Sequence, residues 1–376
     1  MSPSTPDGTT YPAPRFRVAV VQVEPIHEDV LPAVVHLLRL NGGDVTVYLN
    51  ELVRTNRPGF KVRFPDIGPL TRFVPMNSKA DWRRLARKVT NSSPDLMVMN
   101  TFQFNAPSNW AHFWEGPMLG VVHNPDRMRA AEDSMALVRR GRVGLVTLAP
   151  HVTTNLMASD TELFASVATI TMTFPRPPKV KVVRPDSRRR IAVPGTVNFD
   201  ARDYEQIVAA VPRMLEHADP GSFDIAIVGP GADRPALEEM VRDAGLSQYF
   251  TFAPLNDQGF VSGDVFYGYL RGSTFLLPSL PADDTTYRVS KITASIPNSI
   301  GLGIPAIIDR WTAAVYGIPA VTYTGDAIGD GLVRAMSMTD AELDEVREDL
   351  QDFGRLEQHR ATAEMGFALR SLGLPG

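Results

Sequence analysis

The order of apolar and polar residues along the first half of the chain predicts alternating strands and helices. Short runs of β-branched and other apolar residues recur, too apolar for strands with one face in water, so they suit a parallel sheet covered on both faces. Segments between them carry apolar residues at helical spacing, as in 30–40 and in a helix that Ser78 caps. The expected strands are 16–23, 44–49, 95–99, 119–123 and 144–148.

Two stretches of the first half lack this rhythm. Residues 51–77 and 102–118 are rich in Pro, Gly and aromatic residues and are weakly periodic. We expect long functional loops or partly extended excursions there.

The same rhythm returns in the second half. The segment 224–228 is a buried strand, Gly229-Pro-Gly231 breaks it, and a helix follows that Asp233 is expected to cap. A capping box at Thr339–Glu342 predicts the start of a last helical region. The other expected strands are 191–193, 249–253, 275–277 and 306–308, with helices from about 202 and near 290–301.

A linker is expected where the composition changes. Residues 175–190 concentrate prolines and cations between two apolar runs, and 376 residues favour two domains over one. We therefore expect a disordered leader at 1–15, an N-terminal Rossmann-like domain at 16–185, a C-terminal domain at 186–350 and a final helix at 351–376.

Composition narrows the possible functions. The net charge of −4 favours no nucleic-acid partner, and we take the short basic runs at 139–142 and 188–190 as solvated loops. The absence of cysteine excludes thiol catalysis, disulfides and cysteine-ligated metals. The polar N-terminus is no signal peptide, and no apolar run approaches the ~20 residues of a membrane span. We expect a soluble, cytoplasmic protein.

Glycine turns between strands and helices are the first candidate ligand site. Gly195, Thr196, Gly229 and Gly231 could bring backbone N–H groups close to a phosphate. The structural alternative is that these glycines only make tight turns. Ser279, at the Pro-Ser corner after a strand, could likewise approach a phosphate or merely turn the chain.

A nucleoside diphosphate also needs cations. Arg202, Arg288 and Lys291 are the candidates, and each could instead be a solvated helix charge. We favour Lys291 because it is expected one turn before Ser295 on the same helix.

Ionisable and aromatic residues follow strands of the first half. Glu24 and His27 lie just after the first strand, where they could bind an acceptor or act as a general base, or simply belong to an acidic helix start. An aromatic loop could stack on sugars or form a packed lid; it contains Trp110, His112, Phe113 and Trp114. No Asp-x-Asp metal motif follows a strand, so no metal site is expected.

The second half resembles the C-terminal nucleotide-binding domain of GT-B glycosyltransferases, particularly the large retaining group that uses nucleotide sugars. The matching segments keep the family's order and spacing over 193–308. They are VPGTV at 193–197, IVGPG at 227–231, YFTFA at 249–253, FLLPS at 275–279 and GIPAII at 303–308. The first half fits the family through its strand–helix rhythm and the strand ending GVVHN.

The resemblance implies two Rossmann-like domains facing a cleft, with a C-terminal helix that crosses back to the N-terminal domain. It implies a metal-independent, retaining transfer of a sugar from a nucleoside diphosphate donor to a hydroxyl acceptor, as in carbohydrate biosynthesis. The donor would bind the C-terminal domain and a small-molecule or glycan acceptor the N-terminal one. No further cofactor is implied, and the oligomeric state stays open.

The resemblance also assigns roles to single residues. Arg202 falls near the group's phosphate-binding lysine. Ser295 and Asn298 would face the cleft, where Asn298 could bind a ribose or sugar hydroxyl or could instead cap the helix. His123 would contact the donor sugar or steady transition-state charge; otherwise it is a satisfied core histidine.

One departure from the family bears on the reaction. Ser290 and Asn298 stand where the group carries two glutamates, and Thr196 stands where an arginine usually follows the glycine. Two other readings of the fold therefore stay open. One is a nucleotide-sugar epimerase or hydrolase, and the other is an inactive relative that acts as a binding protein.

Overall fold

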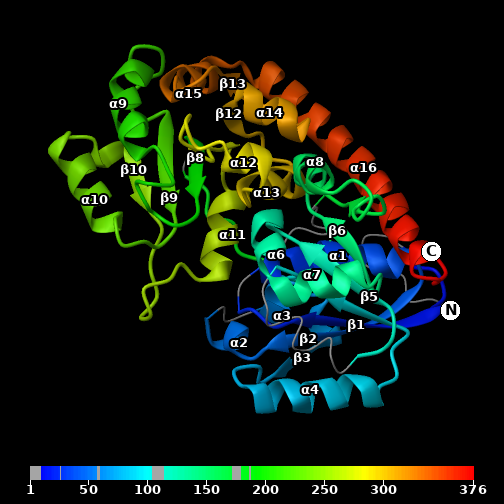
Figure 1. Cartoon of the computed structure of the whole chain (residues 1–376). Coiled ribbons are helices and arrows are strands. Elements are labelled where there is room, and N and C mark those ends of the chain that lie inside the picture. The colour runs from blue at the N-terminus through cyan, green and yellow to red at the C-terminus, as the bar shows by residue number, and fades with distance from the viewer. Residues whose placement is uncertain (1–9, 26, 57–59, 104–113, 172–178, 186–187) are drawn as a thin grey trace. The chain divides into compact units, whose positions relative to one another are not determined.

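The protein was analysed as a computed structural model that describes residues 10–25, 27–56, 60–103, 114–171, 179–185 and 188–376 (Figure 1). Its contacts divide the chain into two compact units. Unit 1 comprises Met1–Pro175, Val289–Ile292 and Leu356–Gly376, and unit 2 comprises Arg176–Arg288 and Thr293–Arg355. Each unit is described by itself.

Unit 1 is built on a seven-stranded sheet in the order β3-β2-β1-β4-β5-β6-β7, and every pairing in it is parallel. This confirms the parallel sheet that the apolar runs predicted. The strands are β1 (Phe16–Gln22), β2 (Gly43–Asn50), β3 (Thr71–Val74), β4 (Leu96–Met99), β5 (Met118–Val122), β6 (Val143–Thr147) and β7 (Ala168–Thr169).

Helices connect these parallel strands, as crossover connections require. Trp82, Leu85, Ala86 and Val89 of α4 pack in one cluster with alternate residues of the strands. The described helices of four or more residues before β7 are α1 (Leu31–Leu40), α2 (Leu52–Asn56), α3 (Phe60–Arg63), α4 (Lys79–Asn91), α6 (Pro125–Ala130), α7 (Glu132–Arg139) and α8 (Pro150–Ser159).

The expectation of a loop or a partly extended excursion at 51–77 needs correction. This stretch contains the short helices α2 and α3, and its strand β3 pairs with β2 from Thr71 to Val74. The segment is therefore regular structure that extends the sheet to its edge.

Unit 2 repeats the plan with a smaller parallel sheet in the order β10-β9-β8-β11. A single bridge between Leu276 and Ala306 continues this sheet toward the parallel pair β12-β13. The strands are β8 (Arg189–Pro194), β9 (Phe223–Val228), β10 (Phe250–Phe252), β11 (Phe275–Leu276), β12 (Ile307–Asp309) and β13 (Val321–Tyr323).

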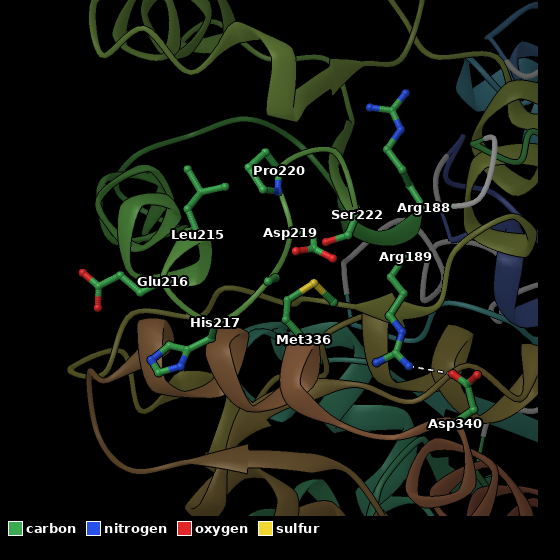
Figure 2. Close-up of a pocket in the computed structure, with 11 residues that line it drawn as sticks. Arg188, Arg189, Leu215, Glu216, His217, Asp219, Pro220, Ser222, Met336 and Asp340 are labelled. Carbon is green, nitrogen blue, oxygen red and sulfur yellow. Dashed lines mark hydrogen bonds and ion pairs between the residues drawn. The ribbon is translucent and has the colours of Figure 1, made fainter.

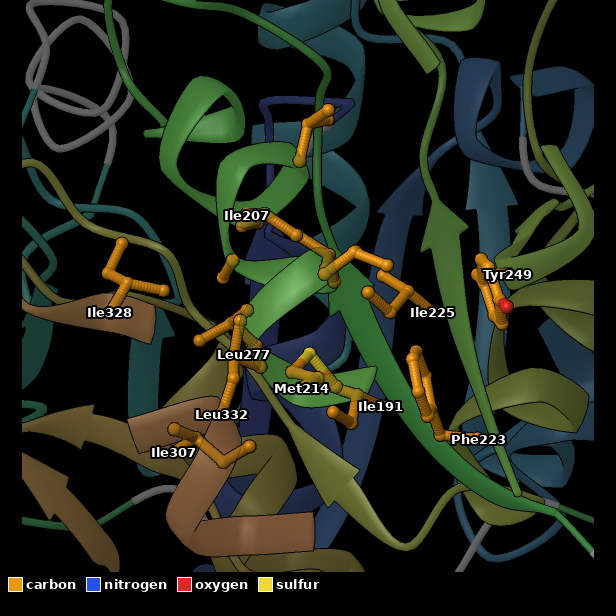
Figure 3. Packing of buried hydrophobic residues seen from close by; sticks show 14 of the residues in the cluster. Ile191, Ile207, Met214, Phe223, Ile225, Tyr249, Leu277, Ile307, Ile328 and Leu332 are labelled. Carbon is orange, nitrogen blue, oxygen red and sulfur yellow. The ribbon is translucent and has the colours of Figure 1, made fainter. Parts of the chain in front are cut away.

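The core of unit 2 follows from the alternation of side chains along its strands (Figure 3). Ile191, Ile225 and Leu277 point to the face that α9 and α15 cover, and all three are fully buried. The opposite face carries small residues, such as Ala192 and Ala226, where α11 packs against β8 and β9. The helices are α9 (Tyr204–Leu215), α10 (Arg234–Asp243), α11 (Gly263–Arg271), α12 (Thr286–Val289), α13 (Ser295–Leu302), α14 (Arg310–Tyr316) and α15 (Ile328–Ser337).

The helix α16 (Asp340–Ser371) begins at the predicted capping box. The Thr339 N–H donates to Glu342 Oε2 at 2.7 Å, and the Glu342 N–H donates back to Thr339 Oγ1 at 3.3 Å. Asp233 is the N-cap residue of α10, as expected, but its side chain does not cap the helix. The Asp233 side chain makes no capping hydrogen bond there, because its carboxylate accepts from the Phe199 N–H at 2.9 Å.

Candidate functional site

Each sheet has one point at which the order of its strands reverses. In unit 1 this point lies between β1 and β4, and in unit 2 between β8 and β11. The chains leave the two strands in opposite directions there, and open α/β sheets commonly bind ligands beyond the carboxyl ends of the strands at such a point. Glu24 and His27 follow β1, Gly195, Thr196 and Arg202 follow β8, and Ser279 follows β11.

In unit 1, a chain of amides crosses this point. Asn100, which follows β4, donates from Nδ2 to Gln22 Oε1 at the end of β1, at 2.6 Å. Gln22 Nε2 in turn donates to the Glu24 carbonyl at 2.8 Å and to Thr101 Oγ1 at 3.2 Å. Asn100 is fully buried, and its Oδ1 has no hydrogen-bond partner among the described residues. A buried acceptor of this kind is suited to a ligand hydroxyl or N–H group.

His123 lies at the end of β5 with one nitrogen already engaged. Its Nε2–H donates to the Asn100 carbonyl at 2.6 Å, which leaves Nδ1 as the unprotonated nitrogen. Burial, followed by the nearby His27, lowers the pKa of His123 to about 3. The imidazole is therefore neutral near pH 7, and its Nδ1 can accept a hydrogen bond.

The loop after β1 brings the other two predicted residues of unit 1 to the same edge. The His27 ring centroid lies 4.5 Å from that of His123, and its backbone is left-handed, with φ of 66°. Glu24 is half-buried, and burial raises the pKa of its carboxyl group. Asn100 Nδ2 also donates to the His27 carbonyl at 3.3 Å, which ties this loop to β4.

In unit 2, the two glycine turns pack backbone against backbone. The Val197 N–H donates to the Pro230 carbonyl at 2.7 Å. A Cβ atom on Gly229 would lie 1.7 Å from Gly195 O, and one on Gly231 would lie 2.0 Å from Val197 O. The turns therefore require glycine for their own close approach, which is the structural alternative that the sequence left open.

Arg202 spans the reversal point of unit 2. It follows β8 and donates from Nη1 to the carbonyl of Pro278, which follows β11. Its Nη2 lies 2.6 Å from where a Cβ on Gly195 would stand, so the guanidinium lies against that turn. Burial lowers the pKa of Arg202, yet a guanidinium stays protonated in proteins. No carboxylate of the described residues forms an ion pair with it.

Ser279 lies next to this cation. Its carbonyl accepts from the Asp203 N–H at 3.1 Å, and its backbone is left-handed, with φ of 51°. Its Oγ is buried and has no hydrogen-bond partner among the described residues. Among the described residues, a cation without an ion pair thus contacts the residue that precedes a serine whose hydroxyl has no hydrogen-bond partner.

The structure changes the expectation for the helix near 290–301. Lys291 does not share a helix with Ser295, because α12 ends at Val289 and α13 begins at Ser295. Lys291 belongs to unit 1, where its carbonyl accepts from His151 Nε2 at 2.8 Å.

Asn298 is not an N-cap. Ala294 caps α13, and Asn298 lies inside the helix, with its N–H donating to the Ala294 carbonyl at 3.1 Å. The side chains of Ser290, Ser295 and Asn298 are buried. That the Asn298 amide binds a ribose or sugar hydroxyl stays a prediction.

Several residues of these edges were not singled out from the sequence. In unit 1 they are Gln22, Asn100 and Thr101, whose available signal was a polar residue directly after an apolar run. In unit 2, Arg234 was missed; it is buried and donates from Nη1 to the carbonyls of Gly229 and Ala253, at 3.2 and 2.9 Å. Its hydrogen bond to the Gly229 carbonyl supports the glycine turn at 229–231.

A large hollow of unit 2 lies away from these carboxyl ends (Figure 2). It measures about 820 Å³ and lies where β8 and β9 begin, lined by Arg189, His217 and Asp340 among others. Arg189 Nη2 pairs with Asp340 Oδ1 at 2.6 Å, so its charge is already matched. The hollow contains none of the predicted site residues.

Three further expectations concern the aromatic loop, a metal site and a membrane span. Trp110, His112 and Phe113 of the aromatic loop lie outside the described residues. In the part of the chain that is described, no three His, Asp or Glu side chains gather closely enough to hold a metal ion. None of its helices is both long and apolar enough to cross a bilayer.

Comparisons with known proteins identify the fold. No family model matches the chain, and no curated protein matches it in sequence. Solved structures do match. HepE of Anabaena, solved with UDP and glucose, has a TM-score of 0.65 at 11% identity, with 95% of this chain and 100% of HepE covered.

Two further structures match at similar coverage. A glycosyltransferase of Rickettsia africae has a TM-score of 0.59 at 12% identity, covering 96% of this chain and 97% of its own. A putative UDP-N-acetylglucosamine 2-epimerase of Listeria monocytogenes has a TM-score of 0.54 at 10% identity, with 95% of this chain and 94% of the epimerase chain covered. The chain has a GT-B fold, as its resemblance to that group predicted.

Proposed function

We propose that the protein is a glycosyltransferase that moves a sugar from a nucleoside diphosphate donor to a hydroxyl acceptor. The observation that carries this proposal is the Arg202–Ser279 pair at the reversal point of unit 2. A partly buried cation without a carboxylate partner is costly unless an anion completes it. A diphosphate supplies that anion, and its oxygens can accept from both the guanidinium and the Ser279 hydroxyl.

The same pair would act in the reaction as well as in binding. As the bond between the sugar and the diphosphate breaks, negative charge grows on the leaving diphosphate. A guanidinium held by the Pro278 carbonyl is already in position, so it stabilises this charge without reorganising. The main chain of the glycine turns is a further candidate for this role.

Unit 1 would receive the acceptor. Its edge offers the Asn100 Oδ1 and His123 Nδ1 acceptors and the half-buried Glu24 carboxyl group. Such groups orient hydroxyls by accepting their hydrogen bonds. Because His123 is neutral with a low pKa, its role is to accept a hydrogen bond and not to act as a general acid. We infer that the transfer needs no metal ion and retains the configuration of the sugar, as the resemblance implies.

Epimerisation or hydrolysis of the donor is the second candidate. The likeness to a putative UDP-N-acetylglucosamine 2-epimerase favours it, since the two chains share this fold at high coverage. Either reaction would consume the donor without an acceptor, whereas a transferase needs the hydroxyl.

A panel of nucleotide sugars separates these possibilities. Each UDP-, GDP- or ADP-sugar is incubated with and without a mixture of hydroxyl acceptors, and released nucleoside diphosphate is measured. The proposal expects one donor class whose turnover rises with acceptor. A nucleoside diphosphate at one hundred times its Kd should also stabilise the protein by about 2.7 kcal/mol. If no donor is consumed and no nucleoside diphosphate raises the melting temperature, the proposal is wrong.

A further inference from the structure

A second pocket of unit 2 lies at the carboxyl ends of β12 and β13. It has a volume of about 370 Å³, near the lower end of the ~300–1,000 Å³ common for small-molecule sites. Asp309, the last residue of β12, and Thr324 and Gly325, which follow β13, line it together with α14. Ala282 and Ala314 are among its lining residues, and their small side chains leave room for a ring.

Two of the three charged residues that line this pocket, Arg288 and Asp309, compensate each other, and the third, Arg310, is exposed. The Arg288 side chain is 2% exposed and that of Asp309 is 6% exposed, and Nη2 of the arginine lies 3.4 Å from Oδ2 of the aspartate. Arg288 also donates to Thr312 Oγ1 at 2.9 Å and to the Ala282 carbonyl at 3.0 Å. Because the buried Arg288 already has its anion, Arg310 is the remaining cation of the lining, and it is exposed to solvent, which screens its charge.

One wall of the pocket is an exposed indole. Trp311, at the start of α14, is 55% exposed, which is unusual for the largest apolar side chain. The Arg288 guanidinium carbon lies 4.6 Å from its ring centroid, so a cation–π contact holds the ring from one side. A ring fixed in this way can present apolar surface to a ligand at little cost in side-chain entropy.

We propose that this pocket binds a neutral pyranose, with the indole of Trp311 stacked on one face of the sugar. A pyranose has apolar C–H faces and a rim of hydroxyls, and the mainly apolar lining of the pocket suits one of those faces. Trp311 and the alanines supply apolar surface, while Thr324, Arg310 and the Gly325 main chain supply polar groups. The inference rests on the proposed function, because the ring would belong either to the sugar of the donor or to a glycan acceptor.

Ligand-observed NMR tests this inference without relying on turnover. Methyl glycosides of glucose, galactose, mannose and N-acetylglucosamine are titrated into the full chain, and saturation transfer to each ring proton is measured. Trp311→Ala removes the wall, and Trp311→Phe keeps a smaller aromatic face. Phe260→Ala is the matched control, since Phe260 is an aromatic residue of unit 2 that is 48% exposed and does not line the pocket.

We expect at least one glycoside to receive saturation mainly on the protons of one ring face. Trp311→Ala should weaken its binding about tenfold, Trp311→Phe about threefold, and Phe260→Ala not at all. A Trp311→Ala protein that binds every glycoside as tightly as the wild type overturns the inference. So does a wild type that binds none of them, either free or as part of a nucleotide sugar.

Nucleotide binding separates the two sources of the ring and the two proposals. If the ring belongs to the donor, Trp311→Ala weakens the nucleotide sugar but not the bare nucleoside diphosphate. If it belongs to the acceptor, the variant weakens the free glycoside and leaves both nucleotides unchanged. If a nucleoside diphosphate stabilises every variant, and Trp311→Ala binds the glycosides and the nucleotide sugars as tightly as the wild type, this inference alone is overturned. Glycoside binding that depends on Trp311, without nucleotide binding, would support it and contradict the proposed function.

Discussion

The reversal points of the two sheets have the same backbone plan but opposite chemistry. In unit 1, amides and a neutral imidazole connect the strand ends through Gln22, Asn100 and His123. In unit 2, the Arg202 guanidinium connects them through the Pro278 carbonyl. The first edge offers the neutral acceptors of Asn100 and His123 beside the half-buried Glu24 carboxyl group, and the second offers a cation that has no ion pair among the described residues. We propose that one plan serves a hydroxylated ligand in unit 1 and a phosphorylated one in unit 2, because the residues after the strands differ.

The comparison also separates residues that shape an edge from residues that can bind there. The glycines of unit 2 are needed for the contact of one turn with another, while Arg202 and Ser279 have bonding capacity that the fold leaves unused. Substitutions at the two kinds of position should therefore have different effects, on stability in one case and on affinity in the other.

The largest effect is expected from Gly229→Ala. Its Cβ would lie 1.7 Å from the Gly195 carbonyl oxygen, and a backbone atom in a packed turn cannot move aside. We expect a loss of roughly 4 kcal/mol in the free energy of unfolding, measured with urea. Gly354→Ala is the control, because the nearest atom to its Cβ is Ile300 Cγ2 at 3.4 Å, and it should lose nothing. A loss below about 1 kcal/mol at Gly229 would show that the turn is not packed as described.

Arg202→Ala should have the largest effect on ligand affinity. Removing the cation leaves the diphosphate without its charged partner, so we expect about a hundredfold weaker binding by calorimetry. Arg213→Ala is the matched control, since Arg213 is exposed and pairs with Asp330 on the surface. It should bind the nucleotide as the wild type does, and equal affinity for both variants would remove Arg202 from the site.

The neutral edge of unit 1 has a signature in the pH dependence of stability. The pKa of His123 in the folded protein is about 3, below its ordinary value of 6.5. Its contribution to the free energy of unfolding is therefore complete above pH 6.5, and it is lost as the pH falls toward 3, because only the unfolded state takes up the proton in that range. Between pH 7 and pH 5 this residue should cost about 2 kcal/mol of stability. His123→Gln should remove that part of the loss in urea unfolding at the two pH values, and an unchanged loss would contradict the neutral imidazole.

The smallest effect is expected at Ser279. Its hydroxyl has no hydrogen-bond partner among the described residues, so Ser279→Ala should change the stability by less than about 0.5 kcal/mol. It should weaken nucleoside diphosphate binding about fivefold through the lost hydrogen bond. Ser279→Gly should weaken binding equally but raise stability by about 1 kcal/mol, because it relieves the positive φ. Unaltered affinity in both variants would separate Ser279 from the ligand.

The parts of the fold that local sequence determines were predictable. All six residues of β9 are buried, and its apolar run identified it. The four residues of β3 do not have such a pattern, since an edge strand with an exposed Arg72 is defined by its pairing with β2. The break between α12 and α13 was hidden for a similar reason. The Thr293 N–H donates to the Tyr316 hydroxyl at 3.3 Å, a contact that local residues do not reveal.

The candidate site was predictable to a similar degree. The glycine turns and Arg202 were found because they follow strands, and this is where the structure places them. Their partners could not be found, because Pro278 lies 76 residues from Arg202 and only the pairing of β8 with β11 brings them together. The pocket around Trp311 was missed for the same reason, since its lining comes from separate segments between Ala282 and Gly325.

A crystal structure of the protein with the nucleoside diphosphate that stabilises it most tests the central proposal directly. We expect a phosphate oxygen within hydrogen-bond distance of the Arg202 guanidinium, with the Ser279 hydroxyl donating to the same diphosphate. A diphosphate bound elsewhere on the chain, with Arg202 still held only by the Pro278 carbonyl, would contradict it.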